Sequence, residues 1–218
     1  MLPLIAAALA CASPVPADTV VLLGRVERDL TGDGRAEVLR LVGEGSSVDI
    51  LGITFTIESA GTVVFRAALA PLTRTVGLDA GRRELSAAEH QARLEEFGSR
   101  FFAECKFKRP DEFVEWLRRS APGRVARIPA VIDRDRRRQA VVDSLVATGR
   151  PLAEAEERAR YLLGGGAAPV DTATAARSWE EIRRAGVSVF EFSEGGDAVT
   201  AIAWSARDRR FYRLFECC

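Results

Sequence analysis

The sequence predicts an α+β domain, a mainly antiparallel sheet with helices packed on one of its sides. Four short segments before residue 70 and three more after residue 186 read as strands, and apolar and polar side chains alternate in 37–42, 48–58 and 187–192, the period of half-buried strands. Between these groups the apolar period lengthens to that of about five helices. Strands, then helices, then strands is the order of a fold whose helices segregate to one side of an antiparallel sheet.

The four N-terminal strands are expected to form a meander, because short turn-like clusters connect them. These strands cover 20–27, 37–42, 48–58 and 62–69. The three C-terminal strands cover 187–192, 198–205 and 211–217. A glycine pair and a short charged turn separate these last three, so hairpins are expected there as well.

The central part of the chain predicts helices with recognisable start and stop signals. The first runs from Ser86, which forms a capping box with Glu89, until 108–110 breaks it. The other four cover 111–120, 132–148, 151–163 and 173–185. In the third helix, Val141, Val142, Leu145 and Val146 are expected to face the core. The charged run 133–138 is expected to be a solvated, salt-bridged helix start.

Composition indicates a globular protein whose net charge does not favour a charged partner. The chain has 218 residues, 47% of them hydrophobic, and Lys+Arg and Asp+Glu number 31 each. This length allows one sizeable core, so residues 18–218 are predicted to form a single α+β domain. A formal net charge of zero gives no overall attraction to nucleic acid or to an anionic membrane.

The N-terminus predicts export. Residues 2–11 are almost wholly apolar, too short to span a bilayer as a helix but suited to the core of a secretory signal. Small residues at 15–17 favour cleavage before Asp18, whereas Leu9-Ala10-Cys11 resembles a lipobox that would lipidate Cys11. Residues 1–17 are therefore interpreted as a signal peptide or a lipoprotein signal. No basic residue precedes Arg25, so a cytosolic chain with a misassigned start is the alternative.

The cysteines leave the disulfide pairing open. In an oxidising compartment Cys105 can pair with Cys217 or Cys218. A bridge between the two adjacent C-terminal cysteines, or free thiols, are the alternatives.

An acidic loop between the first two strands has the pattern of a cation site. Oxygen-bearing side chains stand at Asp29, Thr31 and Asp33, followed by Gly34 and then by Glu37. Calcium takes six to eight oxygen ligands, and a sharply turning loop can direct alternate side chains at one point. Glycine tolerates the backbone conformation that such a turn requires.

This spacing resembles the calcium loops of the FG-GAP, VCBS and dockerin type, over these nine residues and no more. The resemblance implies Ca²⁺ held by the side chains of Asp29, Thr31, Asp33 and Glu37 and by the carbonyl of Arg35. An EF-hand is excluded, because its twelfth position needs a glutamate and Arg40 stands there. The alternative is a tight hairpin turn whose polar side chains cap the backbone.

Catalytic signatures are absent from the sequence. It has one histidine, His90, and no G-x-S-x-G, S-x-x-K or H-E-x-x-H motif. Adjacent acids such as Glu156 and Glu157 are expected to face solvent. The expected function is that of an exported bacterial protein, a non-enzymatic binding or structural protein of the cell envelope or the medium, with one structural calcium loop. Its partner would be a protein or an envelope ligand.

The alternative function is a secreted hydrolase that uses Asp and Glu residues which no motif marks. Such acids can come from any part of the chain. A membrane contact is expected only through a lipid anchor at Cys11.

Overall fold

The computed structural model describes residues 19–45, 50–69, 87–164, 171–195 and 198–217. The predicted signal segment 1–17 with Cys11, the predicted capping residue Ser86, and Cys218 lie outside these residues. Within the part of the chain that is described, no helix combines the length and apolarity needed to cross a membrane.

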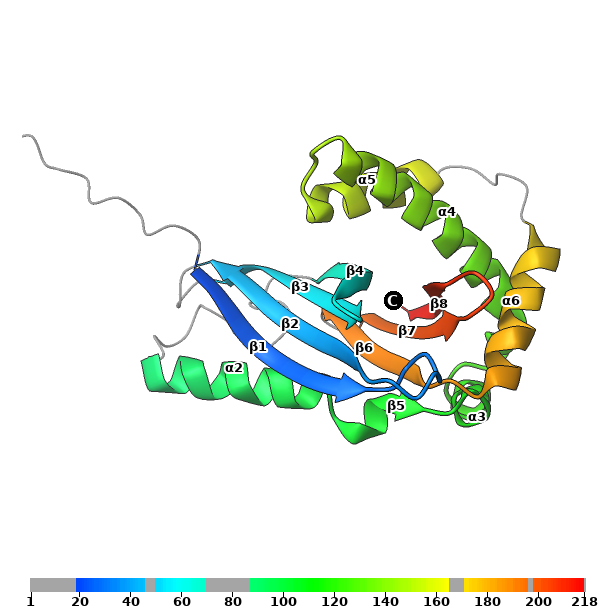
Figure 1. Ribbon diagram of the computed structural model, residues 1–218, viewed down its shortest axis with the longest axis horizontal. Coiled ribbons are helices and arrows are strands. Elements are labelled where there is room, and N and C mark those ends of the chain that lie inside the picture. The colour runs from blue at the N-terminus through cyan, green and yellow to red at the C-terminus, as the bar shows by residue number, and fades with distance from the viewer. Residues whose placement is uncertain (1–18, 46–49, 70–86, 165–170, 196–197, 218) are drawn as a thin grey trace, which may run out of the picture.

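The predicted α+β class is confirmed, and the strands divide into two antiparallel sheets of four (Figure 1). The first sheet has the order β1-β2-β3-β4, a meander of β1 (Thr19–Arg28), β2 (Glu37–Gly45), β3 (Ile50–Ser59) and β4 (Thr62–Leu69). The second has the order β5-β6-β7-β8 and contains β5 (Phe107–Lys108), β6 (Val189–Gly195), β7 (Ala198–Ser205) and β8 (Arg210–Cys217). All seven expected strands are present, and β5 is an addition.

In the described part of the chain, five helices lie between the strands of the first sheet and β6. They are α2 (Ala87–Phe101), α3 (Pro110–Ser120), α4 (Ile128–Ala147), α5 (Leu152–Gly164) and α6 (Thr172–Ala185). The first ends earlier than expected, because 104–106 form a 3₁₀ turn and Phe107 then pairs with Phe190 of β6. In Figure 1, α2 lies along β1, whereas α4, α5 and α6 form an arc around β7 and β8.

Local signals account for several helix ends. The Asp171 carboxylate accepts a hydrogen bond from the Thr174 backbone N–H (3.0 Å) and caps α6. Gly186 ends this helix with φ 65°, a left-handed conformation that glycine adopts without a Cβ penalty. At the start of α3, the Glu112 carboxylate accepts from the Arg109 backbone N–H (3.0 Å).

One hydrophobic core fills the space between the two sheets and α2. Phe55 of β3 is fully buried at its centre, with ring centroids 5.3 Å from Phe101 of α2 and 5.5 and 5.1 Å from Phe190 and Phe192 of β6. Contacts between offset or tilted rings add to the burial of apolar area. The two sheets are therefore joined through aromatic packing.

A second core covers the opposite face of the second sheet. Leu117 of α3, Ile132 of α4 and Ile182 of α6 are fully buried there against Ala203 of β7 and Tyr212 of β8. Both faces of the second sheet are thus covered. Its strands are buried along most of their length, so polar side chains are buried there together with apolar ones.

The cysteines do not form the bridge considered from Cys105. Cys105 is an exposed free thiol, and Cys217 is disulfide-bonded.

Candidate functional site

The acidic loop joins β1 and β2 as predicted, and its exposed carboxylates bond to its own backbone. Asp29 accepts from the N–H groups of Gly32 (2.6 Å) and Gly34 (2.9 Å), and Asp33 accepts from that of Arg35 (2.9 Å). The two glycines have φ angles of 76° and 83°, which side chains with a Cβ rarely adopt.

Glu37 lies beneath this loop and is fully buried. Its carboxylate accepts from the backbone N–H of Leu30 (2.7 Å), from the N–H and hydroxyl of Thr31 (3.2 and 3.1 Å) and from the Ser59 hydroxyl (3.3 Å). Glu37, the last of the proposed ligands, therefore links the loop to the sheet through hydrogen bonds.

The structure brings Asp29, Thr31, Asp33 and Glu37 into one loop, with Arg35 exposed beside them. The hydrogen bonds are those of the hairpin-turn hypothesis. Among the described residues, no group of three or more His, Cys, Asp or Glu side chains is arranged to hold a metal. Calcium binding here stays a prediction.

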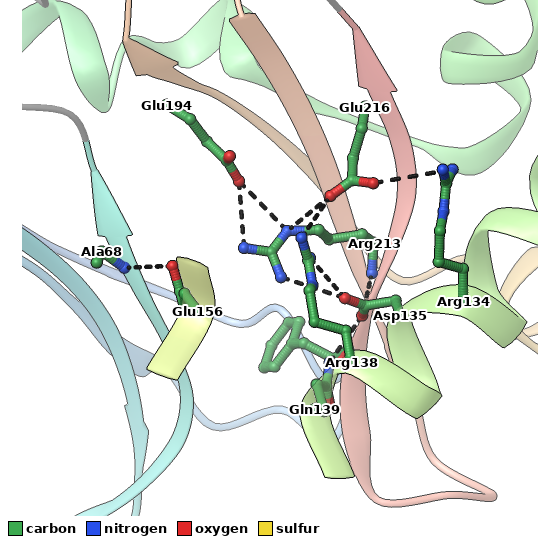
Figure 2. Close-up of polar contacts among 10 residues, drawn as sticks. Ala68, Arg134, Asp135, Arg138, Gln139, Glu156, Glu194, Arg213 and Glu216 are labelled. Carbon is green, nitrogen blue, oxygen red and sulfur yellow. Dashed lines mark hydrogen bonds and ion pairs between the residues drawn. The ribbon is translucent and has the colours of Figure 1, made fainter. Parts of the chain in front are cut away.

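A second polar site, which the sequence did not predict, lies where α4 crosses β8 (Figure 2). Asp135 of α4 is 2% exposed and lies at its centre. Its carboxylate accepts from the backbone N–H (2.9 Å) and the guanidinium Nη1 (3.1 Å) of Arg213, from Arg138 Nη2 (2.7 Å) and from Gln139 Nε2 (2.7 Å). A buried carboxylate needs such donors to offset its lost hydration.

Two further carboxylates complete this ion-pair network. Arg213, 3% exposed, donates from Nε (3.3 Å) and Nη2 (3.2 Å) to Glu194 of β6. Arg138 donates from Nη1 to Glu216 of β8 (2.8 Å), whose other oxygen lies 3.9 Å from Arg134. Three carboxylates thus face three guanidinium groups, so the network is balanced in charge.

The expectation that 133–138 is a solvated helix start is wrong for its aspartates. Asp133 and Asp135 are 3% and 2% exposed, and Asp135 is buried because it faces Arg213 of β8. The expected salt bridges are present, but their aspartate carboxylates are buried. The apolar face expected at 141–146 is half-buried instead.

Glu156 of α5 adds a carboxyl group to this balanced set. It is 8% exposed, contrary to the expectation that it faces solvent, whereas Glu157 is exposed. It accepts from the Ala68 backbone N–H of β4 at 3.3 Å (Figure 2). Burial raises the pKa of Glu156 to about 7, although nearby Arg138 opposes the shift.

Burial also raises the pKa of other acids in the network. The pKa of Asp135 rises to about 7 against the opposing effect of Arg138. Burial likewise raises the pKa of Glu194. Acids whose pKa is displaced toward neutrality, gathered beside a cavity, are typical of binding and catalytic sites.

These groups border a cavity of about 770 Å³ between β4, α4, α5 and the ends of β7 and β8. Its charged lining consists of Asp135, Glu156, Glu157, Glu194 and Glu216 with Arg134, Arg138 and Arg160. Acids outnumber arginines by five to three, so this cavity, called the acidic cavity below, favours positive charge. Leu69 and Leu163 contribute apolar wall.

No protein-family model, curated protein or solved structure matches this chain. The geometry of the acidic cavity therefore carries the functional argument.

Proposed function

We propose that this chain is an exported bacterial binding protein, non-enzymatic, that takes a small polar ligand with a cationic group into the acidic cavity. The observation that carries the proposal is Glu156, a carboxyl group buried beside a network whose charges already balance. A cavity of about 770 Å³ lies within the usual range for small-molecule sites.

The chemistry of Glu156 supports a cationic ligand. Loss of hydration is costly for a carboxylate, and burial raises the pKa of Glu156 to about 7 although Arg138 and Arg160 oppose the shift. An ammonium or guanidinium group in the cavity would supply a counter-charge and favour the ionised form. Ligand binding should then release a proton near neutral pH, and affinity should increase as the pH rises through 7.

Export to the cell envelope, the periplasm or the medium belongs to this proposal and rests on the apolar segment 2–11. The loop 29–37 would serve as a structural calcium site. This loop lies close to the segment that leads into β6, since a Cβ on Gly32 would lie 3.2 Å from a side-chain carbon of Val187. A bound ion would therefore rigidify the loop beside that segment.

A thermal-shift experiment tests the proposal with putrescine, a diamine, against butanediol, which has the same length without charge. At about pH 8, where Glu156 is ionised, putrescine should raise the melting temperature of the wild type and butanediol should not. Glu156→Gln should abolish the shift. Glu154→Gln, an exposed change on the same helix outside the cavity lining, should retain it. Equal shifts by both compounds, or a full shift in Glu156→Gln, would contradict the proposal.

The pKa of Glu156 near 7 also favours a second candidate, a secreted hydrolase in which Glu156 is the general acid. A proton donor is most effective when its pKa lies close to the working pH. Hydrolysis of nitrophenyl glycosides by the wild type and by Glu154→Gln, but not by Glu156→Gln, would favour this candidate over simple binding.

A further inference from the structure

A second cavity of about 580 Å³ lies on the other side of Arg138 and Glu156, which line both cavities. It is bounded by β4, the C-terminal half of α4, the start of α5 and the turn into β8. Five arginines line it, Arg66, Arg138, Arg209, Arg210 and Arg213, against the two acids Asp143 and Glu156. The charge of this cavity, called the arginine cavity below, is thus opposite to that of the acidic cavity.

The positive excess comes from three further arginines of the lining, of which Arg210 also acts electrostatically on Asp135. Arg138 and Arg213 are already bound to the network carboxylates. Arg66, Arg209 and Arg210 make no ion pair with any other residue that the structure describes. Arg209 has a φ of 52°, unusual for a residue with a Cβ, in the turn that places it beside Arg210. Guanidinium groups gathered in this way suit an oxyanion, which they can bind through paired hydrogen bonds.

The lining of the same cavity also includes apolar side chains. Val63 of β4 is 40% exposed, and Val142, Val146 and Leu152 are half-buried. These valines of α4 were expected in the core, and they line a cavity instead. Apolar side chains that stay partly accessible beside charged ones offer an aliphatic group a place to leave water.

We propose that the arginine cavity binds an amphipathic anion, a phosphate or carboxylate head group with a short aliphatic chain. The head would lie on Arg66, Arg209 and Arg210, and the chain would lie along Val63, Val142 and Val146. An inorganic anion alone would leave these apolar side chains unused. The two cavities share Arg138 and Glu156, but the groups proposed to hold the anion differ from Glu156, on which the cation proposal rests, so each proposal can fail without the other.

Calorimetric titration of the full chain with three probes tests the two halves of the site. Hexyl phosphate carries head and chain, inorganic phosphate carries the head alone, and hexanol carries the chain alone. Hexyl phosphate should bind at least about tenfold more tightly than phosphate, because the chain buries apolar area. Hexanol should show no measurable binding.

The double variant Arg66→Gln/Arg210→Gln should weaken hexyl phosphate binding by about tenfold or more, since charged hydrogen bonds are lost. The matched control is Arg118→Gln/Arg184→Gln, which removes the same charge from exposed positions on α3 and α6 outside the cavity. Equal weakening in both variants would indicate general charge attraction and overturn the proposal. Hexanol that binds as tightly as hexyl phosphate would also overturn the proposal. Arg66→Gln alone, an exposed change, gives the same comparison if the double variant does not fold.

Discussion

Asp135 of α4 and Arg213 of β8 are joined both through the backbone N–H of Arg213 (2.9 Å) and through its guanidinium group (3.1 Å). The two side chains are at most 4% exposed. Because one partner contributes its backbone, the contact sets the position of the helix along the strand as well as neutralising charge. The cavities on either side of this contact depend on that placement.

Asp135→Asn should therefore destabilise the protein by about 3–5 kcal/mol at about pH 8, where the carboxylate is ionised. The variant leaves the buried guanidinium groups of Arg138 and Arg213 short of a counter-charge. Urea unfolding measures the change in the free energy of unfolding. Asp143→Asn, at an exposed position of the same helix, is the control. A loss for Asp135→Asn no larger than that of the control would show that the network is not needed for stability.

The contact between α2 and β1 gives a second prediction. A Cβ on Gly98 of α2 would lie 1.8 Å from the Leu23 backbone carbonyl oxygen, so Gly98→Ala requires the helix to move. Ala is favoured over Gly in a helix by about 1 kcal/mol, but overpacking costs about 1–3 kcal/mol, and more when backbone is struck. The net effect should be destabilising in chemical denaturation. Gly52→Ala, which meets no atom within 4 Å, should change little. A more stable Gly98→Ala variant would mean that this close approach does not exist in solution.

The strands and helices could be predicted because their signals are local. The turn residues 59–61, for example, place the start of a strand at Thr62, and β4 has the expected bounds 62–69. The division into two sheets could not be predicted, since it depends on contacts such as those of Phe55 with Phe190 and Phe192, far apart in sequence. Strand β5 exists because Phe107 pairs with Phe190. Because β5 has only two residues, the sequence shows no alternation of apolar and polar side chains from which it could be predicted.

The acidic loop was recognisable because its residues are consecutive, although the burial of Glu37 depends on Ser59 of β3. The ion-pair network had one local signal, the spacing of Asp135 and Arg138 on one helical face. Their partner Arg213 lies 78 residues after Asp135, and Glu156 is buried only because α5 packs on β4. Charge at these positions was visible in the sequence, but burial was not.

The raised pKa of Glu156 predicts how stability depends on pH. In the unfolded chain this carboxyl ionises near its ordinary 4.5, whereas in the folded protein its pKa is about 7. The folded state therefore holds the proton longer, and this group's contribution to stability falls as the pH rises from about 4.5 to 7. The full difference corresponds to at most about 3 kcal/mol.

Glu156→Gln removes this dependence and should become more stable than the wild type as the pH rises, by up to about 3 kcal/mol at about pH 8. Urea unfolding of both proteins at about pH 4 and about pH 8 measures it. Glu154→Gln, exposed on the same helix, should follow the wild type at both values. A difference between Glu156→Gln and wild type that does not change with pH would show that the pKa of Glu156 is the same in the folded and unfolded states.

Calcium binding to the loop is tested best by substituting Asp33. Glu37 cannot separate the two hypotheses for the loop, because its buried carboxylate accepts backbone N–H groups whether or not an ion binds. Asp33 is exposed and accepts only from the neighbouring Arg35 N–H among the contacts described, so Asp33→Ala should leave the turn largely intact.

If the loop binds calcium, millimolar Ca²⁺ should raise the melting temperature of the wild type relative to EDTA and leave Asp33→Ala unchanged. An ion at about a hundred times its Kd adds about 2.7 kcal/mol to the folded state, which corresponds to several degrees. Magnesium at the same concentration is the control, since its preference for strict octahedral geometry disfavours a loop of this kind. A wild type that melts at the same temperature in EDTA and in Ca²⁺ would establish the hairpin turn, whose carboxylates serve the backbone alone.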